Sequence, residues 1–130
     1  MEREILFKAK SIEPSTLGMW FEGSLMVCSV CRYILPENPL TPIGLLKHRV
    51  DPGTVCQFAG FTDINGKKVF EGDYDKDGNC VVFCDECHGW QFGEIDIPTK
   101  DICIPCHNCD GNFMIGDWIE KFEVVGNIHD

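Results

Sequence analysis

The sequence has few basic residues and no long apolar run, and both absences restrict what the protein can bind. Among its 130 residues, 11 are Lys or Arg and 21 are Asp or Glu, so the formal net charge at pH 7 is −10. Proteins bind a phosphate backbone by displacing counterions with Lys and Arg, so this balance argues against nucleic acid as a partner. Anionic membrane surfaces are disfavoured for the same reason, and no stretch approaches the roughly 18 apolar residues of a membrane span.

Targeting and catalytic motifs are missing as well. The opening MEREILFKAK lacks the basic-then-apolar plan of a signal peptide, so we expect a soluble, cytosolic protein. The sequence contains no Walker loop, nucleophile elbow or HExxH motif, and its four histidines are scattered. An enzyme would need His88 or His107 beside an acid and a metal with an open position. We therefore expect a protein without catalytic activity.

The apolar content is sufficient for a folded core. Hydrophobic residues make up 44% of the chain and include nine Phe and three Trp, which is too apolar for a disordered segment. A chain of this length forms one domain or two small subdomains that share a core.

Period-two alternation and closely spaced turn residues predict a mainly β fold. Asn65-Gly66 between two apolar runs predicts a tight hairpin, because both residues tolerate positive φ. Three prolines within residues 36–44 predict a surface loop, and residues 44–50 are expected to form a helical turn. The predicted strands are residues 4–10, 20–27, 33–35, 54–61, 67–70, 81–83, 90–92, 95–97, 113–115 and 122–128.

Nine cysteines stand out in a chain without a secretion signal, and their odd number argues against a disulfide framework. Four pairs are spaced three residues apart, whereas random placement would give roughly 0.5 such pairs. This excess favours metal ligation. The cysteines are Cys28, Cys31, Cys56, Cys80, Cys84, Cys87, Cys103, Cys106 and Cys109.

Two of these pairs share the pattern Cys-x-x-Cys-x-Gly followed by an aromatic residue. We predict that Cys84, Cys87, Cys106 and Cys109 bind one zinc ion as two zinc knuckles. The 18 residues between the two pairs lie within the usual zinc-ribbon range. Four thiolates leave no open position for water, so this zinc would be structural. Cys103 remains an alternative to Cys109, because Cys103 and Cys106 have the same spacing.

Other interpretations of the polar motifs are weaker. Residues 84–88 match the Cys-x-x-Cys-His of haem attachment, and Cys103, Cys106 and Cys109 resemble three ligands of an iron–sulfur cluster whose fourth cysteine is missing. Residues 73–78 imitate the start of a calcium loop, but the twelfth position is a cysteine, so a polar turn is expected.

Cys28 and Cys31 flank a predicted hairpin turn. They are either thiols that the hairpin tolerates or half of a second metal site completed by Cys56 or Cys80. A thioredoxin-like redox pair would need a helix N-terminus, and a strand–turn–strand context offers none.

The run DPGTVCQFAGFTDINGKKVFEGD, residues 51–73, resembles the signature segment of the YopX-like family of small phage and prophage proteins. Residues 3–10 resemble the opening of that family, and residues 122–129 resemble its closing strand. The resemblance implies a mostly β protein of a bacterial host cytoplasm, with an SH3-like barrel in the C-terminal part. It implies no activity and no site residues.

These observations together predict an N-terminal β subdomain, residues 1–70, and an SH3-like barrel part, residues 71–130. The Cys-rich stretch 80–111 departs from the family pattern and is interpreted as a zinc-knuckle insertion. We expect a non-enzymatic module that binds a host or phage protein.

The alternative is a nucleic-acid-binding module, because zinc ribbons and SH3-like barrels recur in such proteins. It would require a basic patch. The candidate residues for that patch are Lys8, Lys10, Lys47, Arg49, Lys67 and Lys68.

Overall fold

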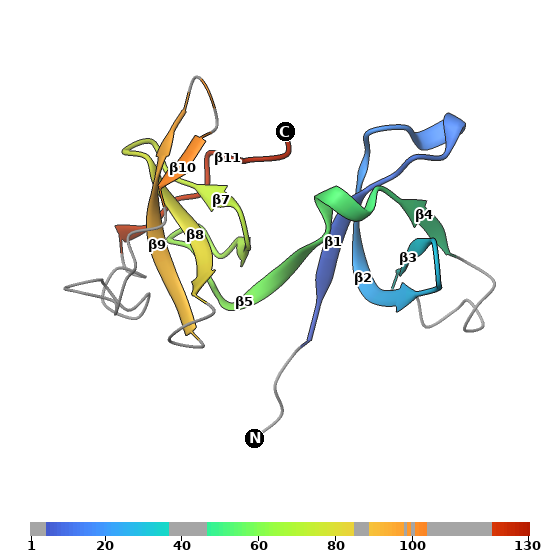
Figure 1. Ribbon diagram of the computed structural model, residues 1–130. Helices are drawn as coiled ribbons and strands as arrows, with labels where there is room; N and C mark the ends of the chain where they lie inside the picture. The colour runs from blue at the N-terminus through green and yellow to red at the C-terminus, as the bar shows by residue number, and fades with distance from the viewer. Residues whose placement is uncertain (1–4, 37–46, 85–88, 98, 100, 104–120) are drawn as a thin grey trace. The chain divides into compact units, whose positions relative to one another are not determined.

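The protein is described by a computed structural model in which residues 5–36, 47–84, 89–97, 99, 101–103 and 121–130 are placed. The chain divides into two compact units, Met1–Phe58 (unit 1) and Ala59–Asp130 (unit 2). The boundary predicted after residue 70 lies further along, inside unit 2. Antiparallel strands dominate both units, as the sequence predicts (Figure 1). In the placed ranges, no helix has the length and apolar character needed to span a bilayer.

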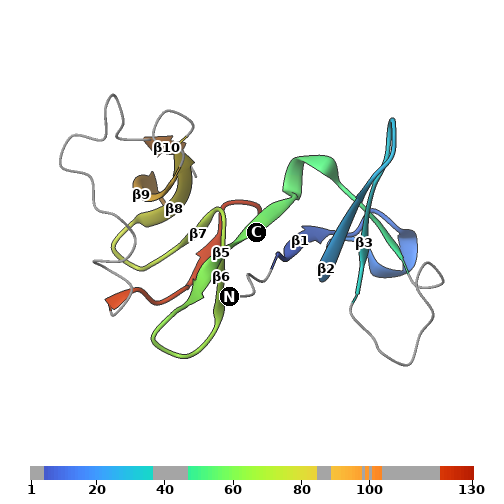
Figure 2. The same cartoon turned by 90° about the horizontal axis from the view of Figure 1, so that it is seen from below.

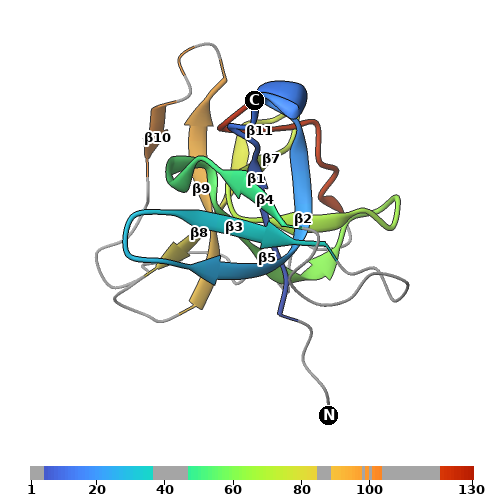
Figure 3. The ribbon, with the colours of Figure 1, turned by 90° about the vertical axis from the view of Figure 1, so that its right-hand side faces the viewer.

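Unit 1 is an antiparallel sheet with strand order β4-β3-β2-β1-β5. β2 and β3 form a hairpin whose strands lie side by side (Figure 3). The predicted strand 20–27 coincides with β2. The elements are β1 (Phe7–Lys10), η1 (Pro14–Thr16), β2 (Trp20–Val27), β3 (Arg32–Leu35), β4 (His48–Val50), η2 (Pro52–Thr54) and β5 (Cys56–Thr62).

The core of unit 1 lies on one face of this sheet. Ala9, Ile34 and Val50 are buried there, and Phe21 and Leu25 pack against them. Ala9 and Val50 lie between charged residues, because successive side chains of a strand point to opposite faces. At these two positions the period-two pattern of the sequence identifies the buried face.

The helical turn expected at residues 44–50 is wrong for the part that is placed. His48–Val50 forms β4, which pairs with β3 in the register Ile34↔His48 and Arg32↔Val50. Val50 enters the core. Pairing with a strand far away in the sequence overrides the weak local preference of this segment.

Unit 2 contains a second antiparallel sheet with strand order β10-β9-β8-β7-β11. β5 crosses the boundary between the units and has β6 as its neighbour (Figure 2). The predicted strands 90–92 and 95–97 are one continuous strand, and only two residues of 122–128 are in a strand. The elements are β6 (Lys68–Phe70), β7 (Asp73–Tyr74), β8 (Asn79–Cys84), β9 (Gly89–Asp96), β10 (Asp101–Cys103) and β11 (Gly126–Asn127).

The placed strands of unit 2 do not form a closed barrel. β10 and β11 are the two edges of the sheet, and these short strands do not pair with each other. A barrel requires its edge strands to meet. The mainly β class is therefore confirmed, whereas the predicted SH3-like closure is not seen in this part of the chain.

Two buried clusters stabilise unit 2. Val69, Val81, Phe92 and Phe122 form the larger one, in which the Phe92 and Phe122 ring centroids are 5.0 Å apart. The other cluster includes Tyr74, Cys80, Val82 and Ile95. Each cluster uses alternate residues of β8, so both faces of this central strand are covered.

Gly23 is required where β2 passes the end of β3. A Cβ added at Gly23 would meet the carbonyl oxygen of Leu35 and lie 2.7 Å from its carbonyl carbon. We expect Gly23→Ala to lower the free energy of unfolding by about 3 kcal/mol, because the backbone of one strand must move. Urea denaturation measures this change.

Gly53→Ala is the matched control in the same unit. A Cβ at Gly53 would meet only the Asp51 side chain, at an ordinary 3.4 Å. We expect a change within about 0.5 kcal/mol. Equal stability of both variants would contradict the close approach of β2 and β3.

Candidate functional site

The aspartates of the signature segment serve the fold. Asp63 is 6% exposed. Its Oδ1 accepts hydrogen bonds from the backbone N–H groups of Asn65 and Lys67, both at 2.9 Å. Its Oδ2 accepts one from the N–H of Val124 at 3.0 Å. A single carboxylate therefore closes the β5–β6 turn and attaches the C-terminal segment to it.

Opposing effects set the pKa of Asp63. Burial raises the pKa, because it disfavours the charged form. The hydrogen bonds from the backbone of Val124, Lys67 and Asn65 lower it and outweigh burial, so the pKa lies below its ordinary value. The carboxylate is thus held in its charged form as a structural group.

Asp73 has a similar role at the end of the signature segment. Its Oδ2 accepts a hydrogen bond from the Phe70 N–H at 2.8 Å, and its Oδ1 accepts one from Asn127 Nδ2 at 2.9 Å. Asn127 Nδ2 also donates to the carbonyl of Glu71 at 3.1 Å. These bonds fix the closing residues of the chain against β7.

The calcium-like run that follows is the polar turn expected from the sequence. Asp75 Oδ1 accepts hydrogen bonds from the N–H groups of Asp77 at 3.0 Å and Asn79 at 2.8 Å. Its Oδ2 accepts one from Asn79 Nδ2 at 2.9 Å. The carboxylate of Asp75 is therefore engaged within its own turn.

Of the four predicted zinc ligands, only Cys84 lies within the placed residues. It ends β8 and pairs with Gly89 at the start of β9. Cys87, Cys106 and Cys109 lie outside the described residues. The alternative ligand, Cys103, ends β10 and pairs with Glu94.

Cys56 and Cys80 do not complete a second metal site with Cys28 and Cys31. Cys56 is 1% exposed, and its thiol donates to the carbonyl of Thr54 at 3.3 Å. Cys80 is fully buried in the core of unit 2. In the parts of the chain that are placed, no three His, Cys, Asp or Glu side chains gather as a metal site would require. The pair Cys28 and Cys31 is free and lies at the tip of the β2–β3 hairpin.

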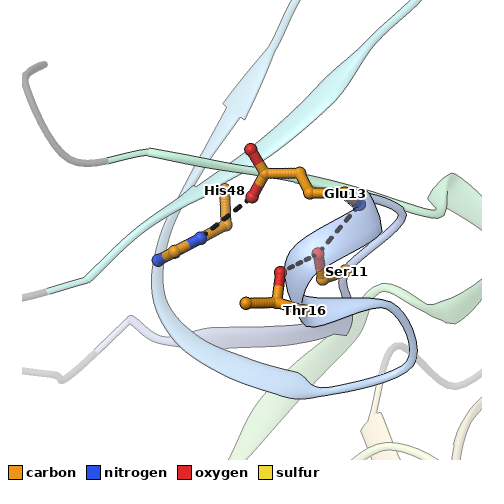
Figure 4. Close-up of polar contacts among 4 residues, drawn as sticks. All are labelled: Ser11, Glu13, Thr16 and His48. Carbon is orange, nitrogen blue, oxygen red and sulfur yellow. Dashed lines mark hydrogen bonds and ion pairs between the residues drawn. The ribbon is translucent and has the colours of Figure 1, made fainter.

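His48 has partners that the sequence did not indicate (Figure 4). Its Nδ1 lies 3.0 Å from Glu13 Oε1, and its ring stacks on Phe21 with centroids 3.7 Å apart. Ser11 Oγ lies 2.7 Å from Thr16 Oγ1 and accepts a hydrogen bond from the Glu13 N–H. The serine hydroxyl is buried and engaged with the η1 loop, so these residues anchor that loop to β4.

The face of the unit 1 sheet opposite the core carries cations over aromatic rings; of these cations, Lys8 is buried and Lys47 is exposed. The Nζ atoms of Lys8 and Lys10 lie 4.6 and 5.5 Å from the centroid of the Trp20 ring. Lys47 Nζ lies 4.9 Å from the centroid of Tyr33. The register places both rings on the face opposite the core. We call these five residues the cationic aromatic face. Their basic members were candidates from the sequence, but the aromatic partners were missed.

Comparison with known families identifies the chain. A family model described as YopX protein matches residues 20–130. The chain belongs to the YopX family. The match begins at β2, so the segment that resembles the family opening, residues 3–10, lies before it. No match was found among curated proteins or among solved structures.

The negative charge of this YopX-family chain is concentrated in one unit. Unit 1 contains six basic and six acidic residues, whereas unit 2 contains five basic and fifteen acidic residues. The whole net charge of −10 therefore belongs to unit 2. The argument from net charge against nucleic acid applies to unit 2 alone.

Removing the Asp63 carboxylate tests the structural role of the YopX signature. Asp63→Ala leaves three backbone N–H groups without their acceptor, so we expect a loss of about 3 kcal/mol in the free energy of unfolding at pH 7. Because the folded-state pKa is lowered, this stabilisation is present above the unfolded pKa of about 3.9. It disappears as the pH falls through the folded pKa. Urea denaturation at pH 7 and at acidic pH measures both effects.

Asp77→Ala is the control, because Asp77 is an exposed turn aspartate of the same unit. We expect a change within about 0.5 kcal/mol at either pH. A loss for Asp63→Ala that does not shrink in acid would contradict the role of its charged form.

Proposed function

We propose that this protein is a phage- or prophage-encoded accessory protein that acts by binding a basic partner protein of the host or the phage. The segregation of charge carries the proposal: unit 2 has a net charge of −10 and unit 1 has none. A concentrated charge of one sign attracts a partner of opposite sign and accelerates its association. The resemblance of the signature segment supports the phage origin and a bacterial cytoplasmic location.

Three exposed carboxylates of unit 2 suit this role. Glu94 and Asp96 are exposed on β9. The turn that carries Asp77 is held beside them, because the Ile95 N–H donates to the Gly78 carbonyl at 2.8 Å. We call Asp77, Glu94 and Asp96 the acidic surface.

The remaining polar groups support a binding role without catalysis. Asp63, Asp73 and Ser11 are buried and hydrogen-bonded within the fold. A cavity in unit 2 has a volume of about 100 Å³, below the roughly 300–1,000 Å³ of typical small-molecule pockets. It is lined by Asp75, Asp77, Asn79, Phe92, Lys121 and Phe122.

Affinity capture with charge-reversed variants tests the proposal. We expect the wild-type chain to retain a stoichiometric basic protein from bacterial lysate, and Glu94→Lys combined with Asp96→Lys to lose it. The same protein should be released near 1 M salt, where charges are screened beyond about 3 Å. Mass spectrometry of the captured fraction identifies the partner.

Glu22→Lys is the control, because Glu22 is exposed on β2 of unit 1. We expect this variant to capture the partner as well as the wild type does. Retention of the partner by the doubly reversed variant would contradict binding through the acidic surface.

The cationic aromatic face favours nucleic acid as a second candidate partner. Proteins hold single-stranded nucleic acid with basic side chains along its backbone and aromatic rings on which its bases stack; unit 1 has both residue types and no net charge to repel it. In the capture experiment, nuclease-sensitive nucleic acid would then replace the basic protein. The nucleic acid would be lost from the Lys10→Glu variant and retained by the variant that combines Glu94→Lys with Asp96→Lys.

A structural zinc at Cys84, Cys87, Cys106 and Cys109 belongs to the same proposal. Strand register supports Cys106 and Cys109 over Cys103. Cys84 lies opposite Gly89 of β9 and Cys103 lies opposite Glu94, so they are about 16 Å apart along the strands. Two sulfurs on one zinc lie only about 4 Å apart. β10 runs antiparallel to β9, toward the end of β9 where Cys84 lies.

Metal analysis of purified variants tests the zinc. We expect about one tightly held zinc ion per chain, lost on Cys106→Ser or Cys109→Ser, because a structural site needs all four thiolates. Cys103→Ser and Cys28→Ser should retain it. Loss of zinc on Cys103→Ser with retention on Cys109→Ser would contradict this choice of ligands.

A further inference from the structure

The tip of the β2–β3 hairpin brings two thiols together at the surface of unit 1. Val27 pairs with Arg32, and the next pair along the hairpin is Cys28 with Cys31. The Cys28 N–H donates to the Cys31 carbonyl at 2.9 Å across a two-residue turn. Residues opposite each other in an antiparallel pair point to the same face, with Cβ atoms about 5 Å apart.

This spacing suits a soft metal ion. Zn–S bonds of about 2.3 Å place two sulfurs of a tetrahedral site about 4 Å apart, which side chains with Cβ atoms about 5 Å apart can reach. Both thiols are free, with Cys28 exposed and Cys31 half-buried. Thiolates select soft or borderline ions such as Zn²⁺ over hard ones.

A neighbouring side chain holds the tip in position. Arg32 Nη1 donates to the carbonyls of Cys28 at 3.0 Å and Cys31 at 3.1 Å, which fixes the turn and places a positive charge at it.

Two thiolates fill only half of a tetrahedral site. Among the placed residues, no third His, Cys, Asp or Glu joins the pair. We propose that Cys28 and Cys31 bind one zinc ion together with the same two residues of a second copy of this chain. Such a contact is self-complementary, because each copy contributes the same surface.

Apolar exposure and charge both favour this contact. Val30, in the turn between the two thiols, is 81% exposed, so a second hairpin would cover apolar surface. Four thiolates around one Zn²⁺ carry a net charge of −2. The Arg32 side chains of the two copies supply two positive charges, which offset it.

Zinc titration into the full chain tests the proposal, and light scattering after size-exclusion chromatography gives the mass. Beyond the tightly held metal, we expect one further ion per two chains, with a doubling of mass that a chelator reverses. Cys28→Ser combined with Cys31→Ser should abolish both effects, whereas Ser29→Ala, in the same turn, should retain them. Cys109→Ser should also retain them, which distinguishes this site from the zinc site at Cys84.

Three results would overturn the proposal: no uptake beyond the tightly held metal, a full further ion per chain without a change in mass, or doubling that persists without Cys28 and Cys31. Arg32→Gln provides a second measurement. It keeps both thiols but removes the charge and the bonds to the two carbonyls. We expect the affinity for the further ion to fall about tenfold, with the four-thiolate spectrum of the Co²⁺-substituted site unchanged.

Discussion

Buried carboxylates that accept backbone hydrogen bonds hold unit 2 together. Asp63 and Asp73 connect the middle of the chain to residues more than fifty positions later, Val124 and Asn127. An unpaired buried carboxylate would be strongly destabilising, so each is surrounded by N–H donors. Because these bonds come from segments distant in sequence, Asp63 and Asp73 specify the tertiary fold.

The surfaces that we propose as binding sites therefore lie outside the signature. The acidic surface follows β9, and the free thiol pair lies at the tip of a hairpin in unit 1. Exposed residues on strands and at hairpin tips do not contact the core. They can therefore be substituted without loss of the fold.

Much of the fold could be predicted from alternation, because a strand with one buried face must alternate. The strand 20–27 and the turn at Asn65-Gly66 follow from local patterns. β4 could not be predicted, because His48–Val50 is too short for a pattern and forms only by pairing with β3. The partners of the candidate site, such as Trp20 beneath two lysine side chains, depend on a register that no local pattern encodes.

The sequence by itself determined the β class, the family and the spacing of the cysteine pairs, because each of these features depends only on residues that are close together in the sequence. Only the tertiary structure decided which carboxylates are buried, which unit carries the charge and how far Cys103 lies from Cys84 along the sheet. These properties depend on contacts between distant segments. Such contacts form when apolar faces are buried together, which also fixes the pairing and register of the strands.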